Sequence, residues 1–109
     1  MNGAIIPVND TGKSVTVTMD TSVITQGSVT CYKKGNVCQF FLSNVKFSSS
    51  GTKNNFLTGL PKAKIQTNVY FSQGDNTAGW INADSTVMNI TVNDATKYFW
   101  GGATYICED

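Results

Sequence analysis

Histidine, charged side chains and long apolar runs are the main absences in this chain of 109 residues. Because histidine is missing, Ser-His-Asp and Cys-His catalysis are excluded. Charged residues make up 14% of the chain, against roughly 25% in typical globular domains, and the net charge of +1 comes without the basic stripe that nucleic acids bind. No run of about 18 apolar residues is present, and the apolar start is too short for a signal peptide, so no membrane insertion is expected.

Cysteine is also scarce, and its count of three is odd. A disulfide-stapled scaffold usually shows an even number, and a structural zinc site needs four ligands, so neither a metal nor a cofactor is expected. Cys31 and Cys38 bracket a turn, and they would face each other if Lys34 and Gly35 were its central residues, which would allow a cross-strand disulfide. The favoured alternative is that both are small buried hydrophobes, while Cys107 has no obvious partner.

Apolar and polar residues alternate with a period of two along much of the chain, which predicts β-strands. The segments are Ser14–Met19, Ile65–Phe71 and Val87–Val92. Their expected inward residues are Val15, Val17, Met19, Ile65, Val69, Phe71, Met88, Ile90 and Val92. No apolar stripe has the 3.6-residue spacing of a helix. We therefore predict one all-β domain, an antiparallel, jelly-roll-like β-sandwich of about seven or eight strands.

The segment Val37–Phe47 differs because both of its faces are apolar. It follows a predicted tight turn in which Gly35 supplies a positive φ. One face would carry Cys38, Phe40 and Leu42, and the other Val37, Phe41, Val45 and Phe47. An antiparallel strand with water on one side should not have this pattern. We predict that Phe41, Val45 and Phe47 form a subunit interface; cover by loops is the alternative.

The acidic residues offer little support for catalysis. Asp75 and Asp84 flank Trp80, so a glycosidase-like acid pair is conceivable, but most carboxylates fall at predicted turns. Asp75 and Asn76 could contribute to a Ca²⁺ site, yet Gly-Asp-Asn is far more often a turn. No phosphate-binding or dinucleotide-binding motif is present. We therefore expect a non-enzymatic domain.

Aromatic residues give the best candidate for ligand binding. Trp80 shares a predicted face with Asn82, and Asp75 and Asn76 stand in the preceding turn. A sugar-binding site needs such a combination, because a ring stacks on sugar C–H groups while amides and carboxylates bond the hydroxyls. The alternative for both tryptophans is a core or interface anchor, and for Trp100 this alternative is favoured.

A series of short motifs covers roughly residues 27–107. They are the turn Lys34–Val37, the apolar strand Val37–Phe47, the element Leu60-Pro61-Lys62, the strand Asn68–Phe71, the hairpin Trp80–Asp84 and the closing strand Trp100–Ile106. Their order resembles the C-terminal domains of bacteriophage tail proteins: fibre tips, baseplate proteins and receptor-binding heads, chiefly of phages and prophages of Gram-positive bacteria. One departure is Asp84-Ser85, where the pattern has Asp-Gly, so a two-residue type I′ turn is not expected there.

The resemblance implies a head domain over residues 27–109, with residues 1–26 as N-terminal strands and a connection to a shaft or neck. It implies a homotrimer that binds a host cell-surface component, such as a cell-wall carbohydrate or a protein, and that contacts other tail or baseplate proteins. Such a virion protein assembles in the host cytoplasm, which favours reduced thiols. A purely structural trimerisation domain and a bacterial surface adhesin domain are the alternatives.

Overall fold

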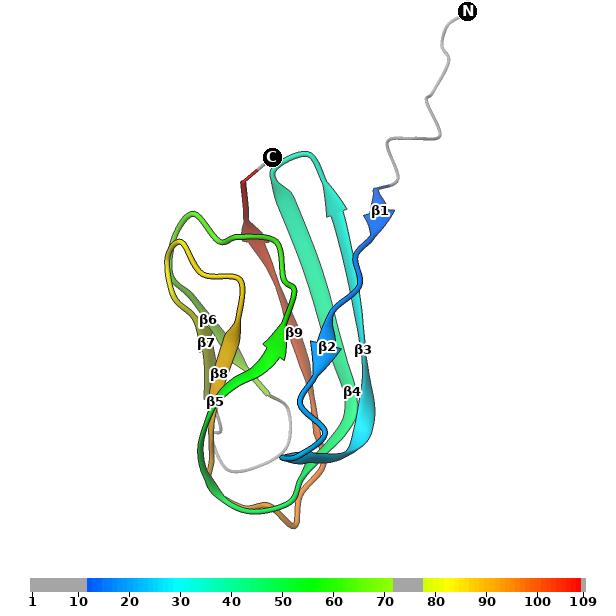
Figure 1. The fold of residues 1–109 in the computed structure, drawn as a ribbon, viewed down its shortest axis with the longest axis vertical. Helices are drawn as coiled ribbons and strands as arrows, with labels where there is room; N and C mark the ends of the chain where they lie inside the picture. The colour runs from blue at the N-terminus through cyan, green and yellow to red at the C-terminus, as the bar shows by residue number, and fades with distance from the viewer. Residues whose placement is uncertain (1–11, 72–77, 109) are drawn as a thin grey trace, which may run out of the picture.

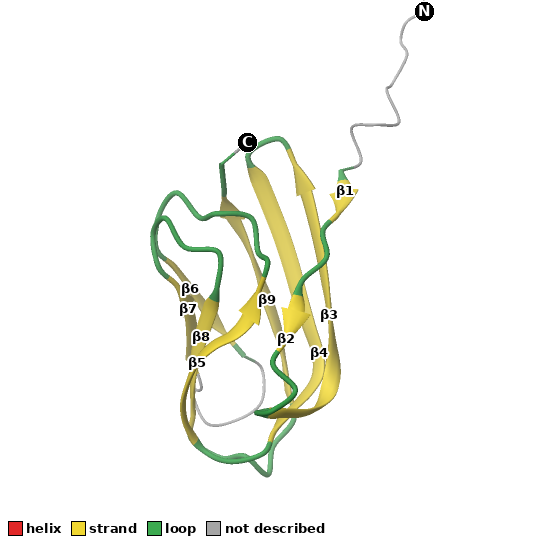
Figure 2. Cartoon of the chain, in the orientation of Figure 1, coloured by secondary structure: helices red, strands yellow, loops and turns green. Residues whose placement is uncertain are grey.

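The protein is built from two antiparallel sheets that face each other. The computed structural model describes residues 12–71 and 78–108, and within these ranges the chain forms nine strands and no helix. The strands lie in two layers with loops at both ends (Figures 1 and 2). The prediction of an all-β antiparallel sandwich is therefore confirmed.

The first sheet has four strands in the order β1-β3-β4-β9. Its strands are β1 Lys13–Ser14, β3 Ile24–Lys34, β4 Val37–Phe47 and β9 Phe99–Ile106. β3 and β4 form a long hairpin, and β9 returns from the end of the chain to pair with β4. This sheet therefore contains the longest strands of the described chain.

The second sheet has five strands in the order β2-β5-β8-β7-β6. Its strands are β2 Thr18–Met19, β5 Gly51–Thr58, β6 Thr67–Tyr70, β7 Ala78–Ile81 and β8 Met88–Val92. β1 and β2 thus join different sheets, and the boundary predicted between residues 26 and 27 falls inside β3. Within the described residues, the chain from Lys13 onward is part of the sandwich. In the described part of the chain, no helix is long and apolar enough to cross a membrane.

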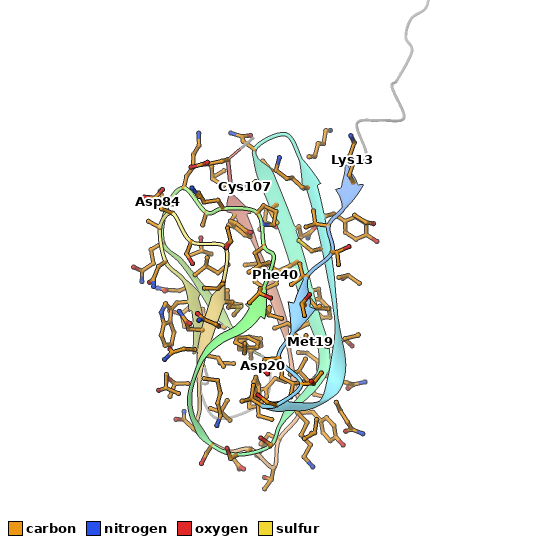
Figure 3. The ribbon with its side chains drawn as sticks, viewed as in Figure 1. Lys13, Met19, Asp20, Phe40, Asp84 and Cys107 are labelled. Atoms are coloured by element: carbon orange, nitrogen blue, oxygen red, sulfur yellow. The ribbon has the colours of Figure 1, made fainter. Side chains whose placement is uncertain are left out.

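The core between the sheets is rich in aromatic rings. Phe47 of β4 meets Phe56 of β5 edge-to-face, with ring centroids 5.5 Å apart. Phe71 meets Phe99 of β9 in the same way at 6.0 Å. Phe40 lies among the side chains between the layers (Figure 3) and is 2% exposed. Each such side chain stabilises the fold by about 1.5–3 kcal/mol through burial.

Most of the inward positions predicted from alternation are confirmed. The buried residues among them are Val69, Phe71, Met88, Ile90 and Val92, and those packed against the core are Val15, Val17 and Met19. Ile65 was expected to face inward and is 60% exposed, so that prediction is wrong. The reason is that strand pairing of β6 begins only at Thr67, so the strand period does not extend back to residue 65.

A bulge in β4 overturns the predicted outer position of two residues. The register between β4 and β9 shifts between Leu42 and Val45, and Asn44 has a φ of 52°. An extra residue in a strand reverses the alternation of faces beyond it. Val45 and Phe47 therefore turn into the core, where they are 0% and 2% exposed. The prediction that they form a subunit interface is wrong, whereas Phe41 lies on the surface.

The β3–β4 turn is shifted by one residue from the register that would oppose the two cysteines. Lys34 pairs with Val37, so Gly35 and Asn36 are the central residues, and Gly35 has the predicted positive φ, at 59°. Cys31 consequently pairs with Phe40 instead of with Cys38. Both cysteines are free and buried, which confirms the prediction of buried thiols.

Candidate functional site

The outward surface of the four-stranded sheet collects most of the exposed apolar side chains. Phe99 and Tyr105 of β9 point inward, so the residues that alternate with them point outward. We call the outward surface of β3, β4 and β9, with the adjoining Tyr98, the outer face. Its large exposed hydrophobic residues are Tyr32, Val37, Phe41, Tyr98 and Ile106.

Two irregularities lie opposite each other at one end of the outer face. The β3–β4 register shifts on both sides of Gln26, and Asn44 stands at the bulge of β4. Gly27 has a φ of 129°, and a Cβ there would lie 2.7 Å from the Cα of Val45, so no other residue fits without displacement. Bulges commonly redirect side chains beside functional sites, and here they bring two amide side chains together.

These irregularities border a hollow of about 460 Å³, which we call the bulge hollow. It is lined by Gln26, Gly27, Asn44 and Tyr98. Tyr98 is 38% exposed, and its ring tilts against Trp100 with centroids 6.5 Å apart. The ammonium group of Lys46 lies 5.4 Å from the centre of the Tyr98 ring, a cation–π contact that holds the ring in place. The hollow has the size of small-ligand sites in proteins.

The bulge hollow offers stacking and hydrogen bonding, with the Lys46 ammonium group over the Tyr98 ring. The amides of Gln26 and Asn44 can each donate and accept, and the ring of Tyr98 offers an apolar surface. The four strands of this sheet contain no Asp or Glu, so a ligand on them meets no carboxylate from the strands themselves. This combination suits a polyhydroxylated ligand with apolar ring faces.

Two smaller hollows continue along the outer face on either side of Phe41, with volumes of about 290 and 410 Å³. Thr30 and Tyr32 line one of them, and Gly102 and Thr104 line the other. Gly102 pairs directly with Phe41, and a Cβ on it would collide with the Phe40 carbonyl oxygen. The glycine therefore lets β9 lie close to β4 and leaves the side of the Phe41 ring open.

The site predicted around Trp80 lies on the other sheet. Trp80 in β7 is half-buried, and its register partners are Asn68 and Asn89. Asn89 is buried, and its amide oxygen accepts a hydrogen bond from the backbone of Asn55 at 2.8 Å, so this amide has a structural role. Asn82 is exposed just beyond the strand. The hollows on the outer face lie on the opposite side of the sandwich from this tryptophan.

The remaining residues of the predicted site are not brought into it by the structure. Asp75 and Asn76 lie outside the described residues. Asp84 has a φ of 63° and occupies the turn that Ser85 closes by donating to the Asn82 carbonyl oxygen at 3.2 Å. This agrees with the prediction that no two-residue type I′ turn forms there. Within the described residues, no group of three or more Cys, Asp or Glu side chains is placed to hold a metal ion.

Exposed carboxylates near the strand ends are engaged in local turns. The Ser22 hydroxyl and backbone donate to Asp20 and lower the pKa of its carboxyl group. Thr96 does the same to Asp94. Both carboxylates therefore stabilise local turns by accepting hydrogen bonds, which is a common role of Asp.

Sequence analysis missed Gln26, Asn44 and Tyr98 as a group, although two signals were present. An isolated glycine inside a strand pattern, such as Gly27, indicates a bulge. Asn tolerates the left-handed backbone better than most residues, so Asn44 inside an apolar strand was a second signal. The sequence alone does not reveal the strand register that places these two irregularities side by side.

Comparisons with protein-family models, with curated proteins and with solved structures each found no match for this chain. The resemblance to phage tail domains therefore remains a hypothesis, and the function has to be argued from the geometry of the site.

Proposed function

We propose that this protein is a non-catalytic binding domain that recognises a carbohydrate on a cell surface through its outer face. The observation that carries the proposal is the bulge hollow, where the Tyr98 ring stands beside the amides of Gln26 and Asn44. A ring with neighbouring amides matches the alternating apolar and hydroxyl surfaces of a sugar.

The low charge of the chain supports the same proposal. Hydroxyl and amide side chains dominate the outer face between its aromatic residues, namely Gln26, Ser28, Thr30, Gln39, Ser43, Asn44 and Thr104. A sheet surface is rigid, so a ligand orders few groups when it binds, and the entropic cost is small.

The resemblance to tail proteins suggests where such a domain works. In that setting it is the receptor-binding head of a phage tail fibre or baseplate, assembled in the host cytoplasm as part of the virion and acting at the host cell surface. The ligand is then a cell-wall glycan of the host, and the domain is one copy of a homotrimer.

The first prediction is that Tyr98→Ala removes binding while folding is retained. Truncation of a central aromatic contact typically costs at least 1–2 kcal/mol, so we expect affinity for host envelope glycan to fall about tenfold or more. Binding would be measured by calorimetry with oligosaccharides from that envelope, and folding by thermal unfolding followed by circular dichroism.

Two variants serve as matched controls. Tyr70→Ala removes an exposed tyrosine of β6, on the other sheet, and should bind as the wild type does. Trp80→Ala tests the site that the sequence predicted. Loss of binding in Trp80→Ala but not in Tyr98→Ala would move the site to the five-stranded sheet, and wild-type protein that binds no glycan would refute the proposal.

A structural role is the second candidate, favoured by the opposite end of the outer face. Val37 pairs with Ile106 there and both are exposed, and Phe41, which is 48% exposed, lies on the same face beyond the Gln39–Thr104 pair. Exposed apolar side chains that gather on one face can mark a protein–protein contact. A domain that only trimerises, in a tail or in a bacterial adhesin, would use this end and would need no glycan.

A further inference from the structure

Three buried cysteines and one tyrosine gather near the β3–β4 turn. The sulfur atoms of Cys31 and Cys38 lie 3.5 Å apart, and both side chains are buried. The backbone of Cys107 donates to the Asn36 carbonyl oxygen at 2.8 Å, which ties the end of β9 to the same turn. Cys107 lies at that end of the sandwich in Figure 3. This cluster is separate from the bulge hollow and takes no part in the proposed binding.

The surroundings of the sulfur pair distinguish its two members. The hydrogen bond with Cys31 lowers the pKa of Cys38 to about 7, with further help from the charge of Lys33, although burial opposes the shift. The bond with Cys38 and burial together raise the pKa of Cys31. Tyr105 itself is fixed, because its hydroxyl donates to the Pro61 carbonyl oxygen at 2.7 Å. Cys38 is therefore the member that ionises first and acts as a nucleophile.

We propose that Cys31 and Cys38 form a dithiol site that a peroxide oxidises reversibly to a disulfide. The Cys38 thiolate attacks one peroxide oxygen, the O–O bond breaks, and hydroxide leaves, so that Cys38 becomes a sulfenic acid. The Cys31 sulfur then attacks the Cys38 sulfur, the S–O bond breaks, and water leaves with the proton of the Cys31 thiol. The two sulfurs together lose two electrons, and hydrogen peroxide is reduced to two waters.

The strand register indicates why the bond would be reversible. Cys31 pairs with Phe40 and Cys38 pairs with Lys33, so the two cysteines stand diagonally across the pair formed by Tyr32 and Gln39. Diagonal residues are typically about 7–8 Å apart at Cα, whereas disulfides span about 5.5–6 Å. Closing the bond draws the two strands together, and such strained disulfides are the more easily reduced ones.

The test uses the full chain, reduced and then treated with hydrogen peroxide. Denaturing alkylation should show that two of the three thiols are lost, and peptide mapping under non-reducing conditions should place the bond between Cys31 and Cys38. The oxidation rate should rise as the pH increases through about 7, and dithiothreitol should restore all three thiols. Cys107→Ser should leave the reaction unchanged.

Cys31→Ser supplies the second variant, because its hydroxyl cannot form a disulfide but can still donate a hydrogen bond to Cys38. In it the disulfide cannot form, so Cys38 should be trapped as a sulfenic acid by dimedone. A bond that includes Cys107, or three thiols that persist under a peroxide dose that oxidises free glutathione in the same solution, would overturn the proposal. If the serine variant does not fold, the peptide map of the wild type alone tests the proposal.

Discussion

Asn44 combines a backbone role and a ligand role that substitution can separate. Its φ of 52° belongs to the left-handed region, which glycine adopts without strain and which a β-branched residue resists. Its amide lines the bulge hollow. A non-glycine residue held in the left-handed region beside a hollow is typical of functional sites.

We predict that Asn44→Gly keeps the free energy of unfolding within about 1 kcal/mol of the wild type but weakens glycan binding. Asn44→Val should lose about 1–3 kcal/mol of stability through strain at this φ. Urea unfolding and calorimetric titration of the same preparations measure the two effects. Unchanged glycan affinity in a folded Asn44→Gly variant would show that the amide takes no part in binding.

At the scale of the strand, β4 contains the change of face that the sequence did not reveal. Before the bulge its side chains alternate as predicted, with Phe40 inward and Phe41 outward, and after it Phe47 points inward as well. Phe47→Ala should therefore lower the free energy of unfolding by about 3–5 kcal/mol, the usual effect of removing a buried aromatic ring. Phe41→Ala should change stability by only about 0.5 kcal/mol.

Chemical denaturation of the two variants provides the comparison, and each serves as the control for the other. Equal losses of stability would mean that the two rings lie in the same environment. That result would contradict a change of face at the Asn44 bulge. A larger loss for Phe41→Ala would contradict the exposed position of the Phe41 ring.

The strands were predictable where local signals suffice, and the site was not. The bounds predicted for the segment Val37–Phe47 coincide with β4, because a run of β-branched and aromatic residues after a glycine turn defines a strand locally. The bulge hollow depends on Gln26, Asn44 and Tyr98, which lie on three strands or their ends and meet only through register. Trp80 stood out in the sequence because a tryptophan near Asn suggests a sugar site. In the structure, the amide of its cross-strand partner Asn89 is bonded to the backbone of β5.

For the whole molecule, the outer face has two ends with different surfaces. The bulge hollow and Tyr98 lie at one end, and Val37 and Ile106 lie at the hairpin end, with Phe41 between them. A homotrimer that buries the hairpin end together with Phe41 would leave the bulge hollow of each copy open. Recognition and assembly are then compatible on one sheet.

This arrangement predicts the behaviour of Phe41→Asp. A carboxylate in an apolar contact opposes association because the charge would lose its water, so light scattering should show a trimer for the wild type and a monomer for the variant. Affinity for a single short oligosaccharide should stay within about twofold, since the hollow is intact. Apparent affinity for a polymeric glycan should fall by about 10²-fold or more, because three linked sites bind with avidity and one does not. Wild-type protein that is monomeric at micromolar concentration would contradict the trimer, and equal loss for both ligands would place Phe41 in the binding site itself.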